Sequence, residues 1–259
     1  MPGISSDIRN DANDGHRLFE KLYLEVRKAE RRLYSDDEVK SLPEIKTGHP
    51  YSGEWKQRKE SCERLIKYLD KKHKPLTILE IGCGNGWFSA QLAKNESRKI
   101  TGIDINKEEL AQAARVFGKI PNLQFIHADI RSGQLKQNNF DVIVFASSIQ
   151  YFPSIREIVK AALLVLKTGG EIHILDTVLY PSGELEAARQ RTKDYFTGLG
   201  FPEAASYYFH HERKDLEGFD AKILYNPESW INKLGKNKNP FYWICIKKEG
   251  KPKLENKQP

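Results

Sequence analysis

From Leu76 onward, short apolar runs alternate with stretches whose apolar residues recur at helical spacing. The runs are rich in Ile and Val and predict β-strands at 77–81, 99–105, 123–128, 141–146 and 171–177. The stretches between them predict helices at 86–94, 107–117 and 154–167. Strands joined by connections of helix length form right-handed β-α-β units, so we expect an α/β fold with a doubly wound, mostly parallel sheet.

The chain before this sheet is predicted to be helical. Between residues 17 and 42, apolar side chains fall at three- and four-residue steps and predict an amphipathic helix. Pro43 and a turn-rich stretch separate it from a second helix at 54–71. We expect residues 17–72 to form a helical N-terminal lid, and the polar residues 1–16 to be disordered.

The chain after the fifth strand is predicted to add a helix at 184–199 and two strands at 221–225 and 241–248. We expect these two strands to pair antiparallel at the sheet edge, which gives about seven strands with the last one antiparallel. The insertion before them would help to shape a pocket. The main domain is therefore expected at 73–248, followed by a basic, disordered tail at 249–259.

Composition narrows the class of protein. With 39% hydrophobic and 30% charged residues, the 259-residue chain has enough apolar material for a core. No run of 18 apolar residues predicts a membrane span, and three widely spaced cysteines without a C-x-x-C pair are typical of a reducing cytoplasm. The net charge of +7 would suit nucleic acid, but much of the excess lies in the tail, so nucleic acid is an unlikely partner.

A glycine-rich turn follows the first predicted strand in ILEIGCGNGWFS, residues 78–89. Gly82, Gly84 and Gly86 would let the backbone approach a ligand closely, and the N-terminus of the next helix offers unpaired N–H groups. A dinucleotide fingerprint would need glycine at 87, where this chain has Trp87. A nucleotide-like ligand other than NAD is therefore favoured, although glycines that serve only tight packing remain the alternative.

Aspartates follow the next two predicted strands. Asp104 ends GIDI, where a carboxylate can accept both hydroxyls of an adenosine ribose. Asp129 ends HADI, where it could accept from the adenine amine while the backbone of Ile130 pairs with the ring. Each aspartate could instead cap a helix. Three such sites at successive strand ends favour a binding site.

The motifs EIGCGNGW, GIDI, HADI, FDVIVFASSIQYF and LKTGGEIHILD, within 76–177, together resemble those of class I S-adenosylmethionine-dependent methyltransferases, with a type 11-like methyltransferase domain. The resemblance implies a Rossmann-like fold, S-adenosyl-L-methionine as cofactor and S-adenosyl-L-homocysteine as product. The cofactor-binding residues implied in this way are Glu80, Gly82, Cys83 and Gly84 at the glycine turn, Asp104 at the ribose, Ile105, Asp129 and Ile130 at the adenine, and Ala146 and Ser147 beneath the methionyl group. Arg58 could pair with the cofactor carboxylate or be an ordinary surface charge.

No universal catalytic residue is implied, because an activated methyl group needs chiefly an oriented nucleophile. The candidates after the fourth and fifth strands are Tyr151, Asp176, Tyr195, Tyr207, Tyr208, His210 and His211. Tyr151 adjoins the expected transfer site and is the best placed, whereas Asp176 could simply end a strand.

The substrate class is indicated by what the loop after the fourth strand contains. Metal-dependent O-methyltransferases place an aspartate where this chain has Ala146-Ser147-Ser148, so we expect no metal. The Asn-Pro-Pro-Tyr type of motif, typical of enzymes that methylate amino groups of nucleic acids or glutamine, is replaced by SSIQYFP. We therefore expect methyl transfer to an O, N or C atom of a small molecule. An RNA or protein methyltransferase, or a noncatalytic cofactor-binding protein, remains the alternative.

Overall fold

The computed structural model describes residues 7–230, 232 and 239–249, with side chains from Leu18 onward. Seven strands form one sheet in the order β3-β2-β1-β4-β5-β9-β8. The strands are β1 (Leu76–Ile81), β2 (Arg98–Asp104), β3 (Leu123–His127), β4 (Phe140–Ala146), β5 (Leu166–Thr177), β8 (Asp220–Tyr225) and β9 (Tyr242–Lys247). The first five run parallel, and β9 is antiparallel to both β5 and β8. The predicted fold class is confirmed.

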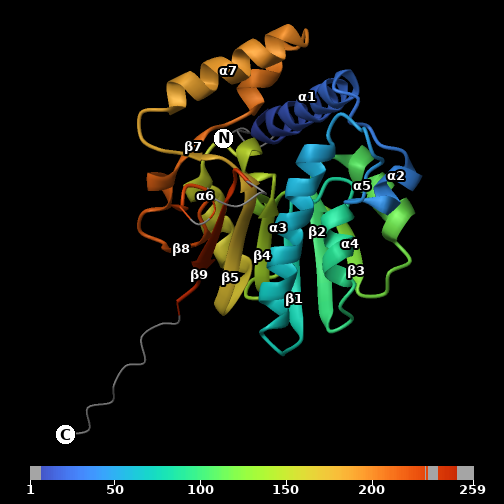
Figure 1. The fold of residues 1–259 in the computed structure, drawn as a ribbon, viewed down its shortest axis with the longest axis vertical. Coiled ribbons are helices and arrows are strands. Elements are labelled where there is room, and N and C mark those ends of the chain that lie inside the picture. The colour runs from blue at the N-terminus through green and yellow to red at the C-terminus, as the bar shows by residue number, and fades with distance from the viewer. Residues whose placement is uncertain (1–6, 231, 233–238, 250–259) are drawn as a thin grey trace, which may run out of the picture.

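Helices cover both faces of this sheet, as Figure 1 shows. The α-helices are α1 (Asp7–Ala29), α2 (Asp36–Ser41), α3 (Ser52–Asp70), α4 (Trp87–Ala93), α5 (Lys107–Phe117), α6 (Ile155–Val165) and α7 (Leu185–Gly198). Short 3-10 turns are η1 (Ile130–Ser132), η2 (Ile149–Tyr151), η3 (Pro202–Tyr207) and η4 (Arg213–Leu216), and two-residue strands β6 (Leu179–Tyr180) and β7 (His211–Glu212) pair with each other. The helices predicted at 54–71, 86–94, 107–117, 154–167 and 184–199 are all present, with shifts of one or two residues at most ends.

The core consists of two buried layers, one on each face of the sheet. Successive residues of a strand point to opposite faces, so Leu79 joins the layer under α6 while Ile78 joins the layer under α3 and α4. Trp243 of β9 also belongs to the second layer and is buried. Burial on both faces explains why the parallel strands are continuous apolar runs.

The N-terminal segment differs from the prediction in two ways. The expected single helix at 17–42 is two helices, because Arg31 has a positive φ of 56° and Ser35 starts α2 with a capping box to Glu38. The α1 backbone begins at Asp7, so the disorder predicted for 1–16 is wrong for residues 7–16. Residues 1–6 and most of the predicted tail, 250–259, lie outside the described residues.

The fifth strand is also longer than predicted. It begins at Leu166 rather than at residue 171, and its register with β4 shifts between Phe140 and Val142. Gly169 in this irregular stretch has a φ of +75°, which other residues rarely adopt. Because β5 begins at Leu166, helix α6 ends at Val165, two residues before the predicted helix end.

Helices α1 and α7 lie together at one end of the sheet (Figure 1). The Tyr195 hydroxyl of α7 donates to Glu30, just after α1, at 2.5 Å. The loop after β4 contacts the segment between α7 and β7, because Phe209 N donates to Gln150 O at 2.7 Å. These contacts place two helices that are far apart in the sequence above the same strand ends.

Candidate functional site

Three cavities meet at the carboxyl ends of the central strands. The Asp104 cavity, about 340 Å³, is lined by residues that follow β1, β2, β3 and β4. The Glu80 cavity, about 90 Å³, lies between the glycine turn and α3. The aromatic cavity, about 510 Å³, lies beneath α1 and α7. Tyr23 and Ser147 line all three, so the junction of the cavities, meaning the place where they are adjacent, lies at these two residues.

Two of the three glycines in the turn are needed for packing, and the third lines two of the cavities. A Cβ atom on Gly82 would lie 2.5 Å from Ser148 Cβ, and one on Gly86 would lie 2.6 Å from the Phe125 ring. These two glycines are therefore required by packing. Gly84 lines two cavities, and a Cβ there would meet the Glu109 carboxylate at 2.9 Å.

Asp104 holds the glycine turn against the end of β2. Gly84 N donates to Asp104 Oδ2 at 2.7 Å, and Asn106 N donates to Asp104 Oδ1 at 2.8 Å. Burial raises the pKa of Asp104, and these backbone N–H groups oppose that rise. A carboxylate has about four acceptor positions, so both oxygens can still accept from a ligand.

Glu109 is a site residue that sequence analysis missed. It lines both the Asp104 cavity and the Glu80 cavity from α5, beside Gly84. Burial and then the nearby Asp104 carboxylate raise its pKa. Its signal was weak, because Glu109 lies in the first turn of α5, where acidic residues are common without any ligand.

Asp129 lines the Asp104 cavity and also caps η1. Arg131 N donates to its Oδ1 at 2.8 Å, and the Arg131 guanidinium contacts both oxygens, with Nη2 at 2.6 Å from Oδ2. The capping alternative is thus real for this residue. It does not remove Asp129 or Ile130 from the cavity wall.

The Glu80 cavity carries charges of both signs. Glu80 is buried and accepts from the Ser89 hydroxyl, and burial raises its pKa to about 8. On the other side, Arg58 Nη2 lies 2.9 Å from Glu54 and donates to Ser147 Oγ at 3.2 Å. A small polar space lined by acidic side chains and a guanidinium suits an amino-acid head group.

All residues predicted to bind the cofactor line the Asp104 or Glu80 cavity. The Asp104 cavity includes Gly82, Gly84, Asp104, Ile105, Asp129, Ile130 and Ser147. The Glu80 cavity includes Arg58, Glu80, Gly82, Cys83, Gly84, Ala146 and Ser147. The sequence therefore identified one connected region of the molecule, and its role in binding stays a prediction.

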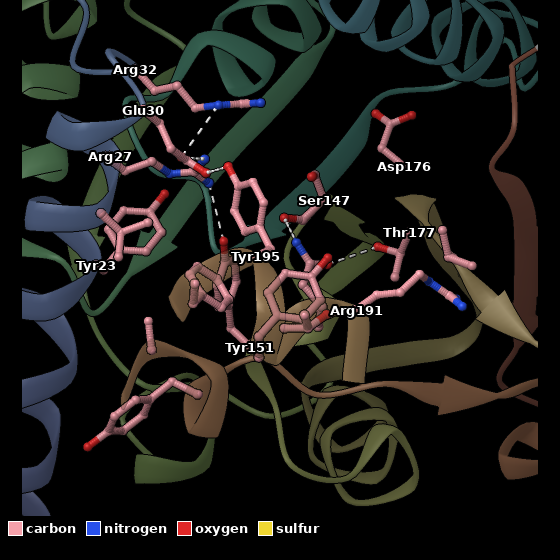
Figure 2. A pocket seen from close by; sticks show the side chains of 18 of the residues that line it. Tyr23, Arg27, Glu30, Arg32, Ser147, Tyr151, Asp176, Thr177, Arg191 and Tyr195 are labelled. Atoms are coloured by element: carbon pink, nitrogen blue, oxygen red, sulfur yellow. Dashed lines mark hydrogen bonds and ion pairs between the residues drawn. The ribbon is translucent and has the colours of Figure 1, made fainter. Parts of the chain in front are cut away.

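The aromatic cavity brings together side chains from α1, α3, α7 and the ends of β4 and β5. Figure 2 shows Tyr151 pointing toward Arg27, whose Nη2 donates to the Tyr151 hydroxyl at 3.2 Å. Tyr151 also lines the Asp104 cavity, which agrees with its predicted place near the junction. Arg32 binds both oxygens of Glu54, at 2.9 and 2.6 Å, and ties the segment after α1 to α3.

Of the other six predicted candidates, four line the aromatic cavity and two do not. Asp176, Tyr195, Tyr207 and Tyr208 line the aromatic cavity, whereas His210 and His211 do not. His211 Nε2 lies 3.2 Å from Ile149 O and helps to hold the loop after β4.

The main residues missed on this side are Arg27, Arg32 and Glu54, which the sequence offered only as charges on helices. Arg27 stands four residues after Tyr23 on α1, so the two share a face that is otherwise apolar. A charge on the apolar face of an amphipathic helix is the signal that could have identified it.

One group of potential metal ligands lies away from these cavities. The ligand atoms of Glu171, His173 and Cys245 are within 4.8 Å of one another. However, Lys72 Nζ is 2.8 Å from Glu171, and Trp243 Nε1 donates to His173 Nδ1 at 3.1 Å. That bond places the proton of neutral His173 on Nε2, facing Glu171, so the group is better suited to a buried polar network than to a cation.

The helices of the described part of the chain are too short or too polar to cross a membrane. The three cysteines, Cys62, Cys83 and Cys245, are buried free thiols.

Comparison with known proteins agrees with this architecture. Residues 78–170 match a family model described as a methyltransferase domain. The chain is 27% identical over 201 residues to a malonyl-[acyl-carrier protein] O-methyltransferase of Halalkalibacterium halodurans, covering 72% of each chain. It is 27% identical to the 27-O-demethylrifamycin SV methyltransferase of Amycolatopsis mediterranei, covering 59% of each.

A solved structure, that of the S-adenosylmethionine-dependent methyltransferase SibL, shares the fold. The TM-score is 0.53 at 19% identity, and the match covers 74% of this chain and 55% of that one. The family match spans β1 to β5, which contains the glycine turn, Asp104 and Asp129. Residues 78–170 are therefore similar to a methyltransferase domain, and the fold of the chain is shared with a methyltransferase of known structure.

Proposed function

We propose that this protein transfers a methyl group from S-adenosylmethionine to an O, N or C atom of a small-molecule acceptor. The observation that carries the proposal is that Tyr23 and Ser147 line the Asp104, Glu80 and aromatic cavities alike, so the three spaces are adjacent at these residues. A methyl donor and an acceptor held in these spaces would meet at that junction. Such placement is most of what methyl transfer requires of a protein.

The residues of the first two cavities fit this cofactor. Asp104 retains acceptor capacity toward ribose hydroxyls, and the apolar side chains of Ile105 and Ile130 line the same cavity. Glu80 offers carboxyl oxygens that could accept from the ammonium of the methionyl part, and Arg58 offers a positive charge to its carboxylate. The backbone of Gly82 and Gly84 would lie against that part.

When bound, S-adenosylmethionine supplies an electrophilic methyl group on its sulfonium. The chain supplies enclosure and orientation. Tyr23 and Tyr151 pack edge to face at 5.6 Å beside the junction, and Arg27 fixes the Tyr151 hydroxyl. Tyr151 is therefore our candidate for a residue that orients the acceptor.

A small-molecule acceptor is supported by the aromatic cavity, which is covered by α1 and α7. The names of the relatives agree with this, because they specify malonyl-[acyl-carrier protein] and 27-O-demethylrifamycin SV. The buried free cysteines agree with a reducing cytoplasm, which we propose as the compartment.

The test has two steps. Isothermal titration should first detect binding of S-adenosylhomocysteine. Purified protein should then transfer labelled methyl from S-adenosylmethionine into the metabolite fraction of an extract from the organism that carries the gene. Label in RNA or protein would instead favour the macromolecular alternative. Binding without transfer into any fraction would favour a noncatalytic cofactor-binding protein.

A further inference from the structure

We propose that Asp176 is the base for methyl transfer and that the acceptor is a hydroxyl compound with an apolar body, which becomes a methyl ether. This inference rests on the proposed function and goes beyond it by naming the acceptor group and its base. It starts from a carboxyl group that the cofactor cavities do not use. Asp176 lines the aromatic cavity and is 6% exposed.

Aspartates lie at the carboxyl ends of β2, β3 and β5, and of these three only Asp176 of β5 lacks a partner at one of its oxygens among the described residues. Both oxygens of Asp104 accept from backbone N–H groups, and both oxygens of Asp129 accept from Arg131. Against the effect of burial, the Ser61 side chain acts to lower the pKa of Asp176, but Asp176 Oδ1 is buried and has no hydrogen-bond partner among the described residues. A buried oxygen left in this way is costly, and a donor from a ligand would satisfy it.

The backbone at Asp176 supports a functional role. Asp176 has a φ of +54°, and Ser147 has a φ of +56°. The two are neighbours across β4 and β5, because Ala146 pairs with Leu175 and Ser147 N donates to Leu175 O at 3.0 Å. Figure 2 shows both along one wall of the pocket. Unfavourable backbone conformations outside glycine concentrate at functional sites, and here Asp176 and Ser147 both line the aromatic cavity.

The charges around the aromatic cavity favour a neutral hydroxyl over an ammonium group. Four arginines line the cavity against three carboxyl groups: Arg27, Arg32, Arg58 and Arg191 against Glu30, Glu54 and Asp176. An ammonium acceptor would have to approach this positive surplus and the sulfonium as well. A hydroxyl brings no charge, and the arginines would stabilise the negative charge that develops on its oxygen.

The step balances without a further reagent. As the acceptor oxygen forms a bond to the methyl carbon, the S–CH₃ bond breaks and its electrons stay on sulfur, which gives S-adenosylhomocysteine. The hydroxyl proton passes to the Asp176 carboxylate and is later released to water. The product is the methyl ether of the acceptor.

The ionisation of Asp176 sets the expected pH dependence. Burial raises its pKa to about 6, against the effects of Ser61, Arg58 and Arg64, while Glu54 adds to the rise. These neighbours all lie on α3. The Cys62 thiol is on the same helix, where burial raises its pKa and the Asp176 charge adds to that rise. The ionised form accepts the proton, so turnover should rise with pH through about 6 and then level off.

The experiment uses the metabolite extract and labelled S-adenosylmethionine with the full chain. The variants are Asp176→Asn, Asp176→Glu and, as control, Asp194→Asn on the exposed side of α7, where Asp194 contacts Gln190. Asparagine tolerates positive φ, so Asp176→Asn should fold. The methylated bond is classified chemically: esters release labelled methanol in alkali, ethers resist alkali but release methyl iodide in hydriodic acid, and N-methyl groups resist both.

We expect ether-linked label, at least about a hundredfold slower transfer by Asp176→Asn, and partial activity in Asp176→Glu. Asp176→Asn should bind S-adenosylhomocysteine like the wild type and lose the rise near pH 6, and Asp194→Asn should match the wild type throughout. Label mainly in esters or N-methyl groups would overturn the inference while leaving the proposed methyltransferase in place. So would an Asp176→Asn variant within about threefold of the wild type, or one whose cofactor affinity falls in parallel with its activity.

Discussion

The Asp104 cavity and the aromatic cavity share Tyr23 and Ser147, yet they are built from different parts of the chain. The first is made mostly by turns at the ends of β1 to β4, and backbone N–H groups hold its main carboxylate. The second is made by side chains of helices that meet from opposite ends of the sequence. The Asp104 cavity, our proposed cofactor side, therefore depends mainly on the sheet topology, whereas the aromatic cavity, our proposed acceptor side, depends on how α1 and α7 pack. The expected effects of four substitutions test this contrast.

Asp104→Ala should have the largest effect and should affect the cofactor side. The change removes acceptors for two ribose hydroxyls and leaves Gly84 N and Asn106 N without their partner. Hydrogen bonds to charged groups contribute about 1.5–3 kcal/mol each, so affinity for S-adenosylhomocysteine should fall at least about a hundredfold by calorimetry. Circular dichroism should show an intact fold. Unchanged affinity would mean that the ribose assignment is wrong.

Tyr151→Phe should affect mainly the acceptor side. The variant removes the hydroxyl that accepts from Arg27 Nη2 at 3.2 Å but keeps the ring between Tyr23 and Tyr208. We expect kcat to fall about tenfold, because one oriented contact contributes roughly 1–1.5 kcal/mol, with little change in cofactor affinity. The measurement is labelled-methyl transfer beside calorimetry. An equal loss of cofactor affinity would show that Tyr151 belongs to the Asp104 cavity instead.

Glu80→Gln should change how the free energy of unfolding depends on pH. Burial raises the pKa of Glu80 to about 8, so the folded state keeps a proton that the unfolded chain has lost, and the free energy of unfolding declines as pH rises from about 4.5 to 8. The substituted amide can still accept from Ser89 but cannot titrate, so this decline should become shallower by at most about 1.4 kcal/mol per pH unit.

Glu54, on α3, has a pKa that is shifted downward, so its contribution to stability depends on pH in the opposite direction. Arg32 and Arg58 lower its pKa to about 2 despite its burial, so its stabilisation is present above pH 4.5 and is lost as pH falls toward 2. Urea unfolding of the wild type and Glu80→Gln at pH 5, 6, 7 and 8 measures the first effect. Parallel curves for the two proteins would contradict it.

Tyr195→Phe should give the smallest effect. It removes the hydrogen bond from α7 to Glu30, but Tyr195 is 49% exposed, so the loss should be below about 1 kcal/mol. We expect KM for the acceptor to rise two- to fivefold, with kcat and cofactor affinity unchanged. A fall in kcat at constant KM would indicate that Tyr195 takes part in the chemical step rather than in covering the aromatic cavity.

The fold, and the grouping of the proposed cofactor-binding residues around the Asp104 and Glu80 cavities, could be predicted because their signals are local. A glycine turn after an apolar strand, and an aspartate after the next strand, fix positions through the sheet itself. The strand predictions were correct even at 221–225 and 241–248, where only short apolar runs were available. The helix predicted at 17–42 was wrong, although the capping box at Ser35 and Glu38 was visible in the sequence.

The acceptor side could be predicted only in part because its contacts are long-range. Arg27 meets Tyr151 across 124 positions, and Tyr195 meets Glu30 across 165. No periodic pattern within one segment reports such a pairing. Asp176 could be identified as a candidate, but its unpartnered oxygen and its positive φ are properties of the folded chain.

The position of β9 has a consequence for synthesis on the ribosome. This strand comes last along the described chain, yet it lies between β5 and β8 and is the partner of both. While the chain emerges, β1 to β5 can pair and the cofactor side can form, but β8 has no place in the sheet until β9 has been made. Between those two moments, the strand ends around the Asp104 cavity would already be in place while the edge of the sheet at β5 is still unpaired.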